Sequence, residues 1–237
     1  MTRTGGFSDL RQSVAEANRA LARAGLVVMS FGNASEVDRA SGVFAIKPSG
    51  LACESITPDE VVVVSLADGE IVEGNHRPSS DTPTHRVLYS TFPSIGGIVH
   101  THSLRATAWA QARRPIPCFG TTHADHFRGE VPVTRPLRVE EIAGDYELNT
   151  GRVIGEYFEL NQLDPLAAPA ALVASHGPFA WGEDAASAVR NAAAVELIAG
   201  LAMDTLAINP DQQPIEGALI ERHFSRKHGP DAYYGQL

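Results

Sequence analysis

Two histidines stand two residues apart at the end of an apolar segment, in the pattern His100-Thr101-His102. Side chains at positions i and i+2 lie on the same face of a strand, so both imidazoles can converge on one ion. A second apolar segment ends in His176, which is followed by a Gly-Pro turn. Asp81 precedes a predicted helix, where its carboxylate can act as a helix N-cap or as a metal ligand. Three histidines and a carboxylate suit Zn²⁺ or a similar divalent cation, so these residues predict a metal site.

Two further segments carry groups that can transfer protons. Residues 121–126 (TTHADH) place one carboxylate, Asp125, between two histidines. This arrangement can form a proton-transfer centre, although segments of this kind also occur as solvated loops. The C-terminal residues 232–236 (AYYGQ) are unusually aromatic. We expect them either to pack on their own subunit or to lie against a neighbouring one.

Three polar, glycine- or serine-containing loops follow apolar segments, at residues 31–35 (FGNAS), 47–50 (KPSG) and 79–80 (SS). Backbone N–H groups, hydroxyls and one ammonium group are what a phosphate monoester needs, although the same residues also fill ordinary turns. The sequence contains no GxGxxG after a strand and no GxxxxGK[ST]. Dinucleotide and nucleoside triphosphate sites are therefore not expected.

Helical and strand-like segments alternate irregularly along the chain. Apolar residues at helical spacing and capping residues predict helices over 10–25, from Thr82 onward, and over 104–112, 185–206 and 215–227. Short apolar runs predict strands at 43–46, 61–64, 71–72, 95–101 and 172–174. This pattern favours a single α/β domain over residues 1–237, with a mixed sheet covered on both faces.

The composition is that of an ordinary globular protein, with 43% hydrophobic and 20% charged residues. The formal net charge of -9 and the lack of long basic clusters argue against nucleic-acid binding, although one pocket can still attract a phosphate. The two cysteines, Cys53 and Cys118, form no CxxC pair and are expected to be buried. No signal-peptide pattern or membrane-length apolar run is recognised, so a cytoplasmic protein without membrane partners is expected.

Five segments, in this order, resemble the class II aldolase/epimerase family, and within it the L-ribulose-5-phosphate 4-epimerases. They are residues 78–86 (PSSDTPTHR), 96–103 (GGIVHTHS), 121–125 (TTHAD), 175–182 (SHGPFAWG) and 233–236 (YYGQ). The resemblance implies a class II aldolase-like α/β fold, in which a central, largely antiparallel sheet is sandwiched between α-helical layers. It also implies one Zn²⁺ per subunit and a homotetramer with fourfold symmetry, whose active sites lie between adjacent subunits.

The resemblance assigns roles residue by residue. The positions that match the zinc ligands of the family are Asp81, His100, His102 and His176. Asp125 and Tyr234 match its acid/base pair. The positions that match the substrate-binding residues are Gly32, Asn33, Lys47, Ser49, Gly50, Ser79, Ser80, His223 and Arg226. The chain departs from the family pattern at His126, where an aromatic residue is expected, and at the additional terminal residue Leu237.

The implied reaction inverts carbon 4 of L-ribulose 5-phosphate to give D-xylulose 5-phosphate, as in L-arabinose catabolism or an ascorbate-related pathway. The carbonyl is at carbon 2, so the proton on carbon 4 is not acidic and simple deprotonation cannot invert this centre. Cleavage between carbons 3 and 4 gives the enediolate of dihydroxyacetone and glycolaldehyde phosphate, and the aldehyde can turn before the bond forms again. We expect a divalent metal to stabilise the enediolate, while Asp125 and Tyr234 exchange protons with the carbon 4 oxygen.

Three other functions are compatible with parts of this pattern. A class II aldolase, such as one acting on fuculose 1-phosphate, shares the fold and metal but carries Glu in the region where Asp81 stands. A non-catalytic scaffold with this fold would be expected to lose the histidines, which are all present. A zinc hydrolase lacks support because the sequence contains no HExxH pattern.

Overall fold

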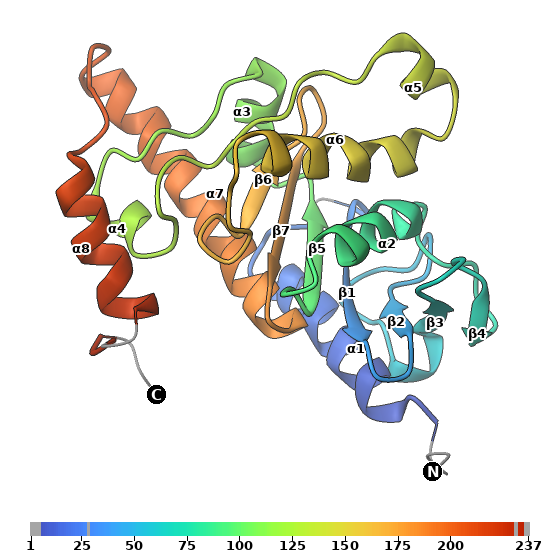
Figure 1. Ribbon diagram of the computed structural model, residues 1–237. Coiled ribbons are helices and arrows are strands. Elements are labelled where there is room, and N and C mark those ends of the chain that lie inside the picture. The colour runs from blue at the N-terminus through green and yellow to red at the C-terminus, as the bar shows by residue number, and fades with distance from the viewer. Residues whose placement is uncertain (1–5, 28, 230–231, 235–237) are drawn as a thin grey trace.

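A seven-stranded sheet with the order β4-β3-β2-β1-β5-β7-β6 forms the centre of the molecule (Figure 1). The computed structural model describes residues 6–27, 29–229 and 232–234. The strands are β1 Gly32–Asp38, β2 Val43–Ile46, β3 Val62–Ser65, β4 Ile71–Glu73, β5 Gly97–Thr101, β6 Ala170–Leu172 and β7 Pro178–Gly182. All six neighbouring pairs are antiparallel. This confirms the largely antiparallel sheet implied by the resemblance, whereas a mixed sheet is not what these strands form.

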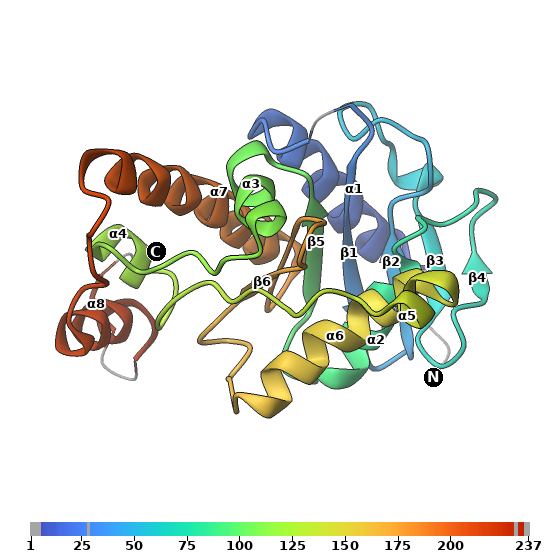
Figure 2. The ribbon, with the colours of Figure 1, turned by 90° about the horizontal axis from the view of Figure 1, so that it is seen from above.

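Helices cover both faces of the sheet, as expected. They are α1 Ser8–Arg23, α2 Thr82–Thr91, α3 Leu104–Ala112, α4 Thr121–Ala124, α5 Val139–Ala143, α6 Tyr146–Leu160, α7 Ala185–Ile208 and α8 Gly217–His228, with the 3₁₀ turn η1 Pro58–Glu60. Figure 2 shows the sheet between α1, α3 and α7 on one side and α2 and α6 on the other. The short helix α4 packs against α8 beyond the β6 edge of the sheet.

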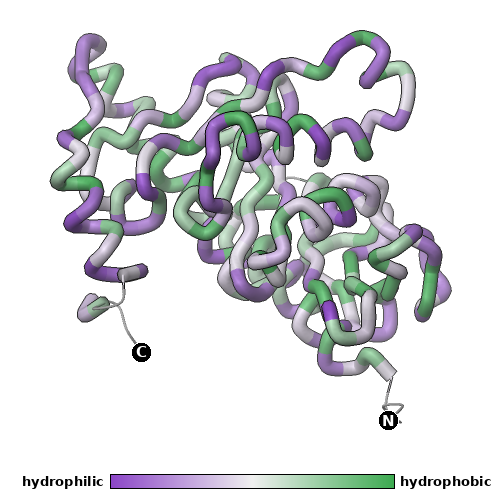
Figure 3. Tube along the Cα trace, in the orientation of Figure 1, coloured by the Kyte–Doolittle hydropathy of each residue, from purple (hydrophilic) through white to green (hydrophobic). Residues whose placement is uncertain are grey.

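The two faces of the sheet bury different side chains. Small residues such as Ala34 and Ala180 face α1 and α7, which lets long helices pack closely on that side. Larger side chains on the other face, such as Phe44 and Trp181, pack against α2 and α6. Figure 3 shows hydrophobic segments running through the centre of the molecule and hydrophilic segments at its outer turns. Burial of this apolar surface provides the main stabilisation of the fold.

Several element boundaries differ from the sequence-based expectation. Residues 31–35 were expected as a loop, but Gly32–Asp38 forms the central strand β1, paired on both sides with β2 and β5. The strand expected at 172–174 is Ala170–Leu172, and the expected Gly-Pro turn begins the strand Pro178–Gly182. These segments are strands because neighbouring strands satisfy their backbone groups, despite low intrinsic β-propensity. The predicted helices are confirmed, and both cysteines are buried.

Helix α7 is long and apolar enough, by length and composition alone, to cross a membrane. The absence of a membrane-length apolar segment, expected from the sequence, is therefore wrong on this criterion. In the structure α7 packs along β5 and β7, and its own Val195 and Ile198 are buried in the core. One face of α7 is therefore apolar because it packs on the sheet, whereas Leu197 and Leu201 of the same helix are exposed.

Candidate active site

Three histidines converge at the end of β5, as the sequence predicts. His100 is the fourth residue of β5, and His102 follows the strand directly. His176 comes from the turn between β6 and β7. One ring nitrogen of each of the three lies within 4.8 Å of those of the other two, and the Nε2 atoms of His100 and His102 are 3.1 Å apart. Three imidazoles in this arrangement can bind one cation.

Strand pairing explains why residues so far apart in sequence meet here. His100 is paired with Phe179 in the β5–β7 ladder, so the turn that precedes β7 lies beside the end of β5. The His100 ring also stacks on Phe179, with ring centroids 4.1 Å apart. Ser175, just before His176, adopts a left-handed backbone with φ of 65°. This conformation is uncommon for a residue other than glycine and makes the tight turn that carries His176.

The histidines are held in the neutral form that a metal requires. Burial, with a smaller contribution from the neighbouring His102, lowers the pKa of His100 to about 3. Burial and the other two histidines likewise lower the pKa of His176 to about 3, and burial lowers the pKa of His102. His100 donates its Nδ1–H to the Pro178 carbonyl at 3.0 Å, which leaves the Nε2 lone pair free. The donor set therefore fits a divalent cation such as Zn²⁺.

Asp81 does not act as a helix cap, although it occupies the N-cap position of α2. Its side chain makes no capping hydrogen bond to the described residues. It instead accepts a hydrogen bond of 2.6 Å from Nδ2 of Asn33, which comes from β1. Asn33 is paired with His100 in the β1–β5 ladder, so this contact links the carboxylate to the histidine strand. Asp81 thus lines the same pocket as the three histidines, although it is not part of the group whose ligand atoms lie within 4.8 Å of one another.

A pocket of about 370 Å³ joins the histidines to the predicted phosphate-binding loops. The residues that line it are Ser30, Phe31, Gly32, Asn33, Lys47, Ser49, Gly50, Ser79, Ser80, Asp81, His100, His102, Tyr146, Glu147 and His176. The seven residues of these loops that match substrate-binding positions of the family are all among them. The sequence analysis missed Tyr146 and Glu147, because they stand at the start of α6 in a segment without a recognisable motif, and it also missed Ser30.

The loops that carry the phosphate candidates are held side by side. Pro48 and Pro78 form an isolated antiparallel bridge, and the Ser79 N–H donates to the Lys47 carbonyl at 3.0 Å. Gly50 has a φ of +78°, which favours glycine at this turn. The Lys47 side chain is buried and donates to the Pro48 carbonyl at 3.1 Å, and burial lowers the pKa of its ammonium group. The ammonium group of Lys47 thus lies among hydroxyl and backbone N–H donors.

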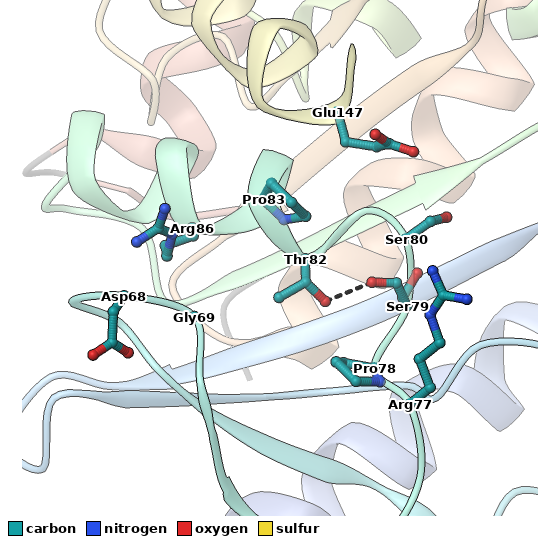
Figure 4. Close-up of a pocket in the computed structure, with 10 residues that line it drawn as sticks. All are labelled: Asp68, Gly69, Arg77, Pro78, Ser79, Ser80, Thr82, Pro83, Arg86 and Glu147. Atoms are coloured by element: carbon teal, nitrogen blue, oxygen red, sulfur yellow. Dashed lines mark hydrogen bonds between the residues drawn. The ribbon is translucent and has the colours of Figure 1, made fainter. Parts of the chain in front are cut away.

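A second cavity, of about 440 Å³, is also lined by Ser79 and Ser80 (Figure 4). Arg77 and Arg86 line it together with Asp68 and Glu147, so charges of both signs are present. Thr82 donates its hydroxyl to the Ser79 carbonyl at 2.6 Å, which is the hydrogen bond drawn in Figure 4. This contact fixes the loop at the start of α2, with Ser80 exposed to solvent.

The predicted acid/base residues form a separate cluster between α4 and α8. Arg226 donates from Nε and Nη2 to the Asp125 carboxylate, at 3.0 and 2.7 Å. His223 Nδ1 lies 3.0 Å from the same carboxylate. The Arg226 guanidinium carbon lies 4.1 Å from the centroid of the Tyr234 ring. The structure therefore brings together Asp125, His223, Arg226 and Tyr234, whereas Gly235, Gln236 and Leu237 lie outside the described residues.

This cluster does not share the metal pocket within one chain. None of its four residues lines the pocket that holds the histidines. Figures 1 and 2 both show α4 and α8 at one end of the molecule, with β2 and β3 at the other. Burial raises the pKa of Asp125, but hydrogen bonds from Arg226 and His223 and the positive charges of Arg226 and Lys227 outweigh it, and the net pKa lies below the usual range. Asp125 is therefore ionised at neutral pH.

The sequence matches the model of the family described as Class II Aldolase and Adducin N-terminal domain, over residues 12–203. Two similar curated proteins are the L-ribulose-5-phosphate 4-epimerases UlaF of Salmonella paratyphi A and of Salmonella typhi. Each is 54% identical over 230 residues, which are 97% of this chain and the full length of the relative.

Solved structures agree with the architecture. An L-fuculose 1-phosphate aldolase superposes with a TM-score of 0.77 and 25% identity, over 92% of this chain and 96% of its own. YgbL of Klebsiella pneumoniae, described as a putative aldolase/epimerase/decarboxylase, gives a TM-score of 0.68 and 26% identity, over 90% and 97% of the two chains. With its antiparallel sheet, its helical layers and its three-histidine pocket, the chain belongs to the class II aldolase family.

Proposed function

We propose that this chain is a metal-dependent L-ribulose-5-phosphate 4-epimerase. The observation that carries the proposal is the pocket that joins three convergent histidines and Asp81 to seven phosphate-binding candidates. The match of 54% identity over 97% of this chain to two proteins named as this epimerase supports the substrate. We treat residues 1–237 as one domain. The L-arabinose pathway and a cytoplasmic location stay predictions.

We assign His100, His102, His176 and Asp81 as the ligands of one divalent cation, with Zn²⁺ as the expected ion. When bound, this ion supplies Lewis-acid stabilisation of negative charge on the substrate oxygens of carbons 2 and 3. The hydrogen bond from Asn33 supports the assignment, because it holds the Asp81 carboxylate away from a capping role. The neutral imidazoles support it as well.

The phosphate group is assigned to the loops on the other side of the pocket. The residues in this role are Gly32, Asn33, Lys47, Ser49, Gly50, Ser79 and Ser80. Their hydroxyls and backbone N–H groups can donate hydrogen bonds to the phosphate oxygens, and Lys47 provides one positive charge. A phosphate held at this end keeps the aldehyde fragment bound while its carbonyl turns. Retention of that fragment is what separates an epimerase from an aldolase.

We assign Asp125 and Tyr234 to the proton transfers at carbon 4. Ionised Asp125 takes the proton of the carbon 4 hydroxyl as the bond between carbons 3 and 4 breaks. The electron pair of that bond moves to the fragment that keeps carbon 2. After the aldehyde presents its other face, the bond forms again and the new carbon 4 alkoxide takes a proton from the Tyr234 hydroxyl. His223 and Arg226 hold the Asp125 carboxylate in place.

The separation of the two clusters supports a site shared between subunits of a homotetramer. Asp125 and Tyr234 of one subunit would then reach the metal pocket of its neighbour. Exposed apolar side chains near the pocket favour such an assembly. Phe31, which lines the pocket, and Leu104, shortly after His102, are both exposed. Leu197 and Leu201, one helical turn apart on α7, are also exposed.

The direct test is an assay of the zinc-loaded protein with L-ribulose 5-phosphate. We expect D-xylulose 5-phosphate to form, and its formation to stop after chelator treatment and in an Asp81→Asn variant. Product that persists without metal would contradict the metal assignment. Release of free aldehyde from a deoxysugar 1-phosphate, without epimerisation, would instead indicate an aldolase.

A further inference from the structure

Each of the three histidines has a neighbour that orients its ring. The carbonyl of Pro178 and the ring of Phe179 hold His100. The ring of Phe31 stacks on His102, with centroids 5.6 Å apart and planes 28° from parallel. His176 differs from both, because its partner comes from an α-helix and not from the sheet or an adjoining loop.

That partner is Tyr146, the first residue of α6. Its hydroxyl oxygen lies 3.2 Å from Nδ1 of His176. The two rings are 28° from parallel, with centroids 6.0 Å apart. A hydrogen bond at Nδ1 leaves Nε2 as the nitrogen that can bind a cation. Among the described residues, no other side chain is hydrogen-bonded to His176.

His176 needs a partner to fix its ring because it lies outside the strands. It stands in a turn and, like His102, it is half-buried. The turn begins with Ser175 in a left-handed conformation, which is costly for a serine. A ring on a short turn can rotate unless a second contact fixes it. The Tyr146 hydroxyl provides that contact from across the pocket.

Close packing of α6 on α2 places Tyr146 at this position. A Cβ atom at Gly151 would lie 2.9 Å from the Thr84 carbonyl oxygen and 2.8 Å from Cβ of Val87, so only glycine allows this approach. Thr150 donates its hydroxyl to the Tyr146 carbonyl at 3.0 Å, and the Tyr146 N–H donates to the Gly144 carbonyl at 3.0 Å. The start of α6 is therefore a fixed support.

We propose that Tyr146 is a positioning residue, whose hydroxyl orients His176 so that the three imidazoles present a preformed site to the metal. The inference rests on the proposed metal site and adds a residue outside the assigned ligands. It predicts that loss of one oxygen atom weakens metal binding by about 10- to 100-fold, which is typical for an outer hydrogen bond to a metal ligand.

The test compares Tyr146→Phe with Tyr157→Phe, a matched control on the same helix. Tyr157 does not line the metal pocket. Zinc affinity is measured for the wild type and both variants by competition with a chromogenic chelator, and thermal unfolding of the metal-free proteins shows whether the fold is intact. We expect weaker zinc binding in Tyr146→Phe alone, with all three metal-free proteins unfolding at similar temperatures.

The outcomes separate this inference from the proposed function. Equal zinc affinity in Tyr146→Phe and Tyr157→Phe would overturn the inference, even if the wild type is an active epimerase. Selective weakening in Tyr146→Phe would support it, even if the wild type does not convert L-ribulose 5-phosphate. A wild type that does not bind zinc would overturn it together with the metal assignment.

Discussion

The metal pocket keeps its histidines neutral, whereas the Asp125 cluster keeps its carboxylate charged. In the pocket, burial keeps His100 and His176 neutral, so their lone pairs are available to a cation. At the α4–α8 contact, hydrogen bonds from Arg226 and His223 keep Asp125 ionised. One region is suited to hold a metal and a phosphate, and the other to transfer protons. The two regions thus offer different chemistry, and they do not share a pocket within one chain.

The largest effect is expected from the metal half. In His100→Asn, kcat/KM should fall by at least about 10³-fold, because Lewis-acid stabilisation is worth several kcal/mol and each 1.36 kcal/mol is a factor of ten. The epimerase rate and the zinc content are measured together. His76→Asn, at an exposed histidine, is the control. A His100→Asn variant with the wild-type rate would remove the basis for a metal site at β5.

Asp125→Asn should separate the two halves. We expect kcat to fall by about 10²- to 10⁴-fold, the usual worth of a general acid or base, while zinc affinity stays at the wild-type value. The measurement pairs steady-state kinetics with zinc competition. If zinc affinity fell along with kcat, Asp125 would support the metal and the distinction between the regions would fail.

Lys47→Met should weaken phosphate recognition with a smaller loss. A hydrogen bond to a charged group is worth about 1.5–3 kcal/mol, so kcat/KM should fall by roughly 10- to 100-fold. Inhibition by inorganic phosphate should weaken in parallel, and Arg152→Met, on the exposed side of α6, should change neither value. Unchanged phosphate inhibition in Lys47→Met would exclude the ammonium group from the phosphate site.

The smallest effect concerns stability against pH. The pKa of Asp125 is depressed in the folded state, so its ion pair stabilises the fold fully above the unfolded pKa, which is about 4 for an aspartate. This stabilisation is lost as pH falls through the folded value. The free energy of unfolding should therefore differ between the wild type and Asp125→Asn at pH 7, and the difference should shrink as pH falls toward 3. A difference that does not vary with pH would show that the pair is not the cause.

Local geometry predicts only part of the metal half. The two-residue period of a strand places His100 and His102 on one side, whereas the long-range pairing of β5 with β7 brings His176 beside them. Tyr146 and Glu147 could not be predicted in the same way. They enter the pocket because α6 packs closely on α2 at Gly151, which is a tertiary contact.

Two other features also depend on tertiary structure. β1 has a sequence of low β-propensity, and it is a strand because β2 and β5 pair with both of its edges. The sequence of the aromatic tail does not distinguish packing on its own subunit from contact with a neighbouring one. In the structure Tyr234 packs on Arg226, which itself binds Asp125. No pattern in one sequence can place this cluster relative to the metal pocket of a second chain.

Subunit mixing tests the central claim most directly, because it asks whether the two halves act together from different chains. His102→Asn removes the metal half and Asp125→Asn the proton-transfer half, and each homotetramer should be inactive with L-ribulose 5-phosphate. Co-expression of the two should restore part of the activity, because some sites then combine an intact metal pocket with an intact Asp125. Mixed tetramers that contain both subunits and bind zinc, yet form no D-xylulose 5-phosphate, would contradict the account.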